Sequence, residues 1–209
     1  MMNYYNKIDI IYINMYILVL VYTYLLAMSA YDIIDINRKP IVHITNSKIS
    51  GYGLFAKKHI HKNTPVVIYY GNKITDADIY NTYENNVDEY CEISKYTRGT
   101  PNGYAINGCR DINNLNLVGV YVNDISKLDC TKDNITYDSI KKYTLTKNKC
   151  NVKVVDTKDY PIYMSTKRIK KNEEIYVHYG IGYWLLQIGC TPEDISMLNR
   201  KYNFSELYS

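Results

Sequence analysis

The apolar residues after position 40 form short runs rather than long amphipathic stretches. Each run holds three to six residues rich in Val, Ile and Tyr, and clusters of Gly, Asn, Asp or Pro separate the runs. This pattern is typical of short β-strands. Helical stretches do not lie between the runs at the spacing that a parallel α/β sheet needs. The sequence therefore predicts a mainly β fold with few helices, in several small irregular sheets. The predicted strands are 41–44, 65–70, 104–106, 118–122, 152–155, 162–164 and 174–179.

Two segments are predicted to be helical, at 76–85 and 192–202. The second has clear start signals. Thr191 suits the N-cap, and Pro192 suits the first helical position, where no N–H is needed. Glu193 and Asp194 then place negative charge in the first turn, next to the positive end of the helix dipole.

The first part of the chain differs in composition from the rest. Residues 10–31 carry no charge and consist mostly of Ile, Leu, Val and Tyr, enough at ~1.5 Å per residue to cross a ~30 Å hydrocarbon layer. Three interpretations of this stretch compete. It is a membrane anchor, or a signal sequence with small residues near Ala27, or a translated upstream region that precedes a true start at Met28. We predict a leader at 1–31, a globular domain at 32–190 and a C-terminal helix and tail at 191–209. The predicted localisation depends on where translation starts. If residues 10–31 are part of the protein, they attach it to a membrane; if translation starts at Met28, the protein is expected in the nucleus or cytoplasm of a host cell.

Composition lowers the weight of any single tyrosine. The 25 Tyr, 27 Ile, 22 Asn and 20 Lys residues make up nearly half of the 209 residues. These residues are encoded by A/T-rich codons, which indicates a compact A/T-rich genome such as that of a large DNA virus or a parasite. A tyrosine therefore gains functional meaning only from its position in a motif.

Charge and cysteine spacing exclude several classes of function. The net charge of +4 is spread along the chain, so nucleic acid is not the first partner predicted. The densest cationic cluster, at 167–171, is interpreted as a solvated turn before a strand, with a targeting or phosphate patch as the alternative. The five cysteines contain no C-x-x-C pair and the four histidines lack ligand spacing, so no metal site is predicted.

Four segments, in order, carry more specific information. Two glycines flank an aromatic residue in the first, and the others combine strands with Tyr-x-Gly, Asn-Asp and Glu-Glu elements. They are 50–56 (SGYGLFA), 60–71 (IHKNTPVVIYYG), 121–124 (YVND) rejoined at 150–153 (CNVK), and 169–180 (IKKNEEIYVHYG) followed by Tyr183 and Trp184.

Together these segments resemble the SET domain, the family of S-adenosylmethionine-dependent protein lysine methyltransferases. The family uses G-x-G-x-F-A, then I-x-x-G-x-x-I-x-E-Y-x-G, N-H-S-C-x-P-N and G-E-E-L-x-x-D-Y-G. The resemblance covers about 41–184 and implies a β-clip fold, with small curled sheets around a knot-like crossing of the chain. It also implies S-adenosyl-L-methionine as cofactor and a protein substrate with a target lysine, for example a histone tail.

The sequence departs from the family pattern at several positions. Asn63 and Asn172 replace glycines, which is a mild change because Asn tolerates a left-handed conformation. Ile68 replaces the Glu before the channel tyrosine, and Asp124 replaces the motif His. An insert at about 125–149 separates the two asparagines of the third motif. No cysteine-rich zinc segment follows the domain, so another cover, from Tyr183, Trp184 and the C-terminal helix, is expected over the cofactor.

The resemblance assigns roles residue by residue. The catalytic pair is Tyr179, which orients the lysine amine, and Tyr69, which lines its channel. The product-specificity position is Val177, where the family uses a larger aromatic residue, so di- or trimethylation is expected. The cofactor-binding residues are Gly51, Tyr52, Gly53, Asn123, Asp124 and Trp184, the first three through the backbone. The competing hypothesis is a SET-like interaction or regulatory module without catalysis, which the altered third motif and the insert motivate.

Overall fold

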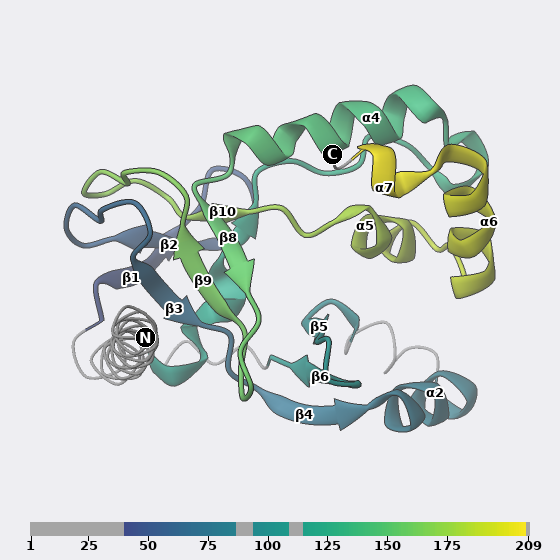
Figure 1. The fold of residues 1–209 in the computed structure, drawn as a ribbon, viewed down its shortest axis with the longest axis horizontal. Helices are drawn as coiled ribbons and strands as arrows, with labels where there is room; N and C mark the ends of the chain where they lie inside the picture. Colours follow the sequence, from purple (N-terminus) through teal and green to yellow (C-terminus); the bar gives the residue numbers. More distant parts are fainter. Residues whose placement is uncertain (1–39, 87–93, 109–114, 208–209) are drawn as a thin grey trace, which may run out of the picture. The chain divides into compact units, whose positions relative to one another are not determined.

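The computed structural model describes residues 40–86, 94–108 and 115–207 of the chain (Figure 1). The chain divides into two compact units, 1–40 and 41–209, and the description below concerns the second unit. The apolar stretch 10–31 lies outside the described residues. Within those residues, no helix is both long enough and apolar enough to span a bilayer.

Within the described residues of the unit, the strands form four small sheets. The antiparallel pair β1 (Val42–Asn46) and β2 (Tyr52–Ala56) forms the first. The second has the order β3 (Pro65–Ile68), β9 (Ile162–Ser165), β8 (Val152–Val155), and the third β4 (Asn72–Thr75), β6 (Tyr104–Asn107), β5 (Thr97–Gly99). The fourth is the short parallel pair of β7 (Asn123–Asp124) with β10 (Tyr176–Val177). The predicted fold of small sheets with few helices is confirmed.

Two of the predicted strands need correction. The run 118–122 lies mainly in a 3-10 helix, η1 (Leu115–Tyr121). A Cβ on Gly119 would lie 2.5 Å from the carbonyl oxygen of Ile68, so this glycine lets the segment pack against β3 without pairing as a strand. The predicted strand 174–179 pairs in β10 only over Tyr176–Val177.

Both predicted helices form with the predicted bounds, as α2 (Asp76–Asn85) and α6 (Pro192–Tyr202). The hydroxyl of Thr191 accepts a hydrogen bond from the backbone N–H of Asp194 at 3.2 Å, and the Asp194 carboxylate accepts one from the backbone N–H of Thr191 at 2.9 Å. This capping box fixes the start of α6. The sequence did not predict α4 (Tyr137–Leu145), α5 (Ile181–Gln187), α7 (Phe204–Leu207) or the 3-10 turns η2 (Lys132–Asn134) and η3 (Thr146–Lys149).

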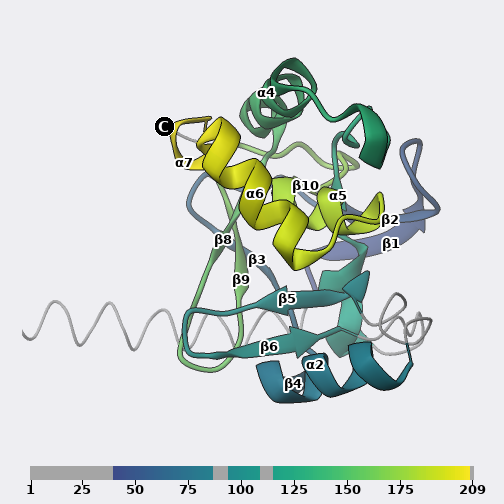
Figure 2. The ribbon, with the colours of Figure 1, turned by 90° about the vertical axis from the view of Figure 1, so that its right-hand side faces the viewer.

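In the part of the unit that the structure describes, two apolar clusters hold the elements together. The larger lies among the sheets and contains Leu54, Val66, Ile106 and Ile175, all fully buried. The smaller joins the insert to the C-terminal helices. Figure 2 shows α4, α5, α6 and α7 gathered on one side of the sheets, with α2 beside the β4-β6-β5 sheet on the other.

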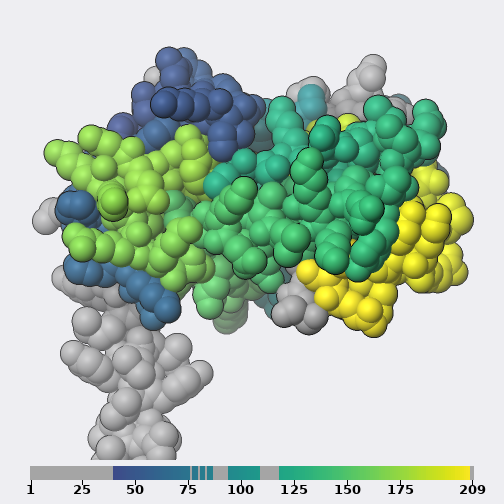
Figure 3. Space-filling model, turned by 90° about the horizontal axis from the view of Figure 1, so that it is seen from above, coloured from purple at the N-terminus to yellow at the C-terminus, as the bar shows by residue number. Residues whose placement is uncertain are grey.

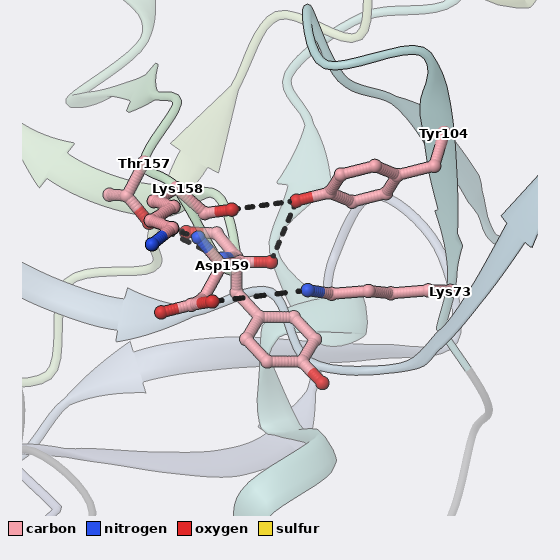
Figure 4. A network of polar contacts seen from close by, with 6 residues as sticks. Lys73, Tyr104, Thr157, Lys158 and Asp159 are labelled. Atoms are coloured by element: carbon pink, nitrogen blue, oxygen red, sulfur yellow. Dashed lines mark hydrogen bonds and ion pairs between the residues drawn. The ribbon is translucent and has the colours of Figure 1, made fainter.

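A polar clamp ties the β4-β6-β5 sheet to the turn between β8 and β9 (Figure 4). The hydroxyl of Tyr104 donates to the carbonyl oxygens of Lys158 at 2.9 Å and Asp159 at 3.2 Å. The ammonium of Lys73 lies 3.9 Å from the Asp159 carboxylate and 4.9 Å and 5.2 Å from the ring centroids of Tyr104 and Tyr160. The clamp fixes the sheet whose edge strand, β5, lines the cavity described next.

Candidate active site

A cavity of about 590 Å³ lies between β5, the η1–β7 segment, β10 and α5. Six of the nine predicted site residues line it, and the structure thus brings three distant motifs to one place. They are Tyr69, Asn123, Asp124, Val177, Tyr179 and Trp184. The glycine motif reaches the lining only through Ser50, so Gly51, Tyr52 and Gly53 lie beside the cavity rather than on it.

Aromatic rings form one wall of the cavity. The ring of Tyr179 meets that of Tyr183 edge-on at 4.7 Å between centroids and stacks on Trp184 at 6.2 Å. Tyr69 meets Tyr163 edge-on at 6.1 Å. Such rings exclude water and present negative π faces and phenolic oxygens, a lining that suits a cationic group.

The hydroxyl of Tyr179 is held deep in this wall. It donates to the carbonyl oxygen of Val122 at 2.9 Å, and Tyr69 donates to the carbonyl oxygen of Tyr96 at 2.6 Å. Burial raises the pKa of Tyr179 well above its usual range, and the nearby Tyr163 hydroxyl acts in the same direction. Burial also raises the pKa of Tyr163 to about 12. Both phenols therefore stay protonated near neutral pH, so each can donate and accept hydrogen bonds but does not act as an anionic base.

The carboxylate of Asp124 is the centre of the hydrogen-bond network at the site. It is buried, and its Oδ2 accepts from the hydroxyl of Tyr143 at 2.5 Å, the backbone N–H of Tyr179 at 3.0 Å and the indole N–H of Trp184 at 3.0 Å. Its Oδ1 accepts from the backbone N–H of Ser126 at 3.3 Å. An ionised carboxylate only accepts hydrogen bonds, and four donors converge on this one. Asp124 thus joins the insert, through Tyr143, to the segment that carries the catalytic candidate.

Asn123 and Glu174 connect the other motifs. The amide nitrogen of Asn123 donates to the Tyr52 carbonyl oxygen and to Glu174 Oε1, both at 3.1 Å. These bonds tie the start of β2 and the buried Glu174 carboxylate to β7. Glu174, which the sequence reading did not single out, is buried and also accepts from the hydroxyl of Tyr176 at 2.8 Å.

The two glycines of the first motif serve different purposes. A Cβ on Gly53 would lie 2.2 Å from Glu174 Oε1, so this glycine makes room for the buried carboxylate. Gly51 adopts a left-handed φ of +50° in the turn between β1 and β2, with open space around its Cα. Tyr52 is 45% exposed, and its carbonyl oxygen rather than its ring reaches the site network.

His178 also lines the cavity, although it is not among the site residues predicted from the sequence. Its ring lies 4.4 Å from that of Tyr143, and burial lowers its pKa below the ordinary value of 6.5, against the opposing charge of Asp124. The signal was present in the motifs: His178 stands where the D-Y-G element has Asp, and Asp124 stands where N-H-S has His. Relative to these motifs, the acid and the imidazole are exchanged: Asp124 lies in β7, and His178 directly follows β10.

Comparison with known proteins agrees with this geometry. A family model of the SET domain matches residues 51–180, more than half of the chain. The match contains eight of the nine predicted site residues, and Trp184 lies just beyond it. A search of curated proteins finds no match.

Proposed function

Since the chain belongs to the SET domain family, whose members are in general lysine methyltransferases, we propose that it is a protein-lysine N-methyltransferase. It transfers a methyl group from S-adenosylmethionine to a lysine of a histone or another protein. The observation that carries the proposal is the buried, protonated Tyr179 hydroxyl in an aromatic cavity beside the Asn123–Asp124 strand.

The residues of the cavity fit the proposed cofactor. Its volume of about 590 Å³ lies in the range of small-molecule sites. The amide oxygen of Asn123 and the backbone of Asp124 provide polar partners, and Trp184 provides an aromatic face. Arg98 also lines the cavity, and its buried Nε–H has no acceptor among the described residues. The Arg98 guanidinium, whose Nη2 lies 3.9 Å from the Asp156 carboxylate, adds positive charge to the lining, which suits a ligand with a carboxylate such as the methionine part of the cofactor.

In this proposal, groups of the protein orient the lysine amine, desolvate it and stabilise the methyl group during transfer. Tyr179 accepts a hydrogen bond from the lysine amine through its hydroxyl and so orients the nitrogen lone pair, while Tyr69 lines the approach. Aromatic and aliphatic walls desolvate the lysine and favour its neutral form, since burial disfavours an ammonium. Carbonyl and hydroxyl oxygens around the transferred methyl, which the bound sulfonium supplies, stabilise its partial charge by weak C–H···O contacts.

Val177 is proposed to set the number of methyl groups added. Its side chain is buried and lines the cavity, in a strand position two residues before Tyr179. A valine there leaves room for a methylated amine, so we expect di- and trimethyl products. Mass spectra that show only monomethyl-lysine after long reaction times would contradict this assignment.

A radiolabelled-methyl assay on histones and whole lysate tests the proposal. We expect incorporation by the full chain and a loss of at least ~100-fold in Tyr179→Phe. The matched control is Tyr137→Phe, an exposed tyrosine on α4 outside the cavity, which should keep wild-type activity. Equal activity of Tyr179→Phe would refute the assigned role.

The second candidate function is a SET-like interaction module without catalysis. The exchange of Asp124 and His178 and the large insert favour it. Titration of the full chain with S-adenosylmethionine separates the two, because Trp184 is the only tryptophan and lines the cavity. A change in its fluorescence on titration supports the enzyme. No change and no incorporation would favour the interaction module.

A further inference from the structure

A dense cluster of positive charge forms where two segments of the folded chain meet. Residues 57–62 (KKHIHK) and 167–171 (KRIKK) lie far apart in sequence, and the antiparallel bridge between Ile60 and Ile169 brings them together. The two backbones exchange hydrogen bonds of 2.9 Å at this bridge. We call these two segments the basic ribbon. In Figure 1 they form the adjacent loops after β2 and after β9.

The side chains of the ribbon divide sharply between core and solvent. Ile60 and Ile169 are buried, whereas the seven Lys and Arg side chains and both histidines are exposed. Antiparallel neighbours of the bridge place His61 beside Arg168 and His59 beside Lys170. Figure 3 shows these yellow-green and blue segments meeting at one end of the surface.

Within the described residues, no ion pair neutralises this charge. The ribbon holds seven of the 25 Lys and Arg residues and none of the 21 Asp and Glu residues, so the rest of the chain is net acidic. The next carboxylate along the chain, Glu173, accepts from the backbone N–H of Lys170 at 2.8 Å. Lys167 donates to the carbonyl oxygen of Lys149 at 3.0 Å, which joins the end of the insert to the ribbon. Seven cations gathered on two adjacent segments repel one another, so their charge does not itself stabilise the fold.

We propose that the basic ribbon binds the phosphate backbone of duplex DNA. The ribbon presents Lys, Arg and His without exposed aliphatic or aromatic side chains. Protein interfaces are poor in lysine and need apolar anchors, whereas duplex backbones are contacted by such cations. Single strands need aromatic stacking platforms, which the ribbon lacks, so a duplex is favoured. Contacts to phosphates carry no sequence information, so we expect the DNA to be bound without regard to sequence.

Fluorescence anisotropy of the full chain with a labelled duplex of about 20 base pairs tests this proposal. The test variant is Lys167→Glu with Arg168→Glu. Its matched control is Arg200→Glu with Lys201→Glu, the same charge change in the last turn of α6. At low salt we expect micromolar binding, a Kd at least tenfold higher for the test variant and a salt slope smaller by about 2. The control should lose much less affinity for DNA. The melting temperatures of both variants show whether they fold.

Three results would overturn the proposal. The first is no DNA binding at about 50 mM salt, and the second is an equal loss in both variants, which would mean a net-charge effect alone. The third is tighter binding to duplex RNA or to polyglutamate than to DNA, which would assign the ribbon to another partner. The assay contains no methyl donor, so its outcome is separate from that of the methyltransferase proposal.

Discussion

Replacement of Asp124 by Asn should weaken both the fold and methyl transfer. The substitution keeps the shape of the side chain but removes the charge that four donors share, and the new amide N–H₂ must face at least one of them. A hydrogen bond to a charged group contributes about 1 kcal/mol more than a neutral one. Four such bonds are lost or weakened, while relief of the buried charge offsets part of the loss. We therefore expect the free energy of unfolding to fall by about 2 kcal/mol.

The same change should lower kcat more than it raises KM for the protein substrate. Asp124 holds the backbone N–H of Tyr179 and the indole of Trp184, so its loss shifts the groups that orient the amine. A displacement of about 1 Å at a reacting centre is enough to cost ~100-fold in rate.

Urea unfolding followed by Trp184 fluorescence and steady-state methylation measure the two effects. The exposed Asp129→Asn serves as the control for charge. If Asp124→Asn does not fold, Tyr143→Phe removes one donor only and should cost about 1–2 kcal/mol with a smaller loss of kcat. Unchanged stability and kcat in both variants would refute the role assigned to this network.

Other positions give equally direct tests. Gly53→Ala should displace the Glu174 carboxylate and lower the melting temperature far more than Gly51→Ala, which costs only the ~1 kcal/mol of a left-handed alanine. His178 has its pKa lowered by burial below the ordinary 6.5, so the folded chain binds fewer protons than the unfolded one below that pH. Stability should therefore fall as the pH drops from about 6.5, and His178→Gln should flatten the curve of unfolding free energy against pH; a wild-type slope in that variant would contradict this. Thr191→Ala should cost ~1 kcal/mol in urea unfolding by removing the N-cap of α6, and no change would show that the cap is not needed.

The sequence predicted those parts of the fold whose local signals agree with their packing. Thr191 and Pro192 mark the start of α6 by themselves, and the apolar run at 152–155 forms β8. By contrast, the run 118–122 looks like a strand, because nothing local reveals that Gly119 packs against the Ile68 carbonyl. The strands β4 and β5 are too polar to stand out, since only the partner strand β6 orders them.

Most of the candidate site could be predicted from the order of the motifs in the sequence. It located Tyr69, Asn123, Asp124 and Tyr179, which line one cavity. It could not reveal that Tyr143, inside an insert without a family counterpart, donates to Asp124. Contacts of this kind depend on the path of the chain in three dimensions, and so does the juxtaposition that forms the basic ribbon.

The small apolar cluster shared by the insert and the C-terminal helices has an evolutionary consequence. Ile140 of α4, Leu185 of α5 and Phe204 of α7 are buried in one apolar cluster. None of these short helices could bury its apolar face alone. A lineage that lost the insert would expose the C-terminal helices to water, and the reverse loss would expose the insert. We therefore expect the two segments to be gained or lost as a pair among related SET proteins.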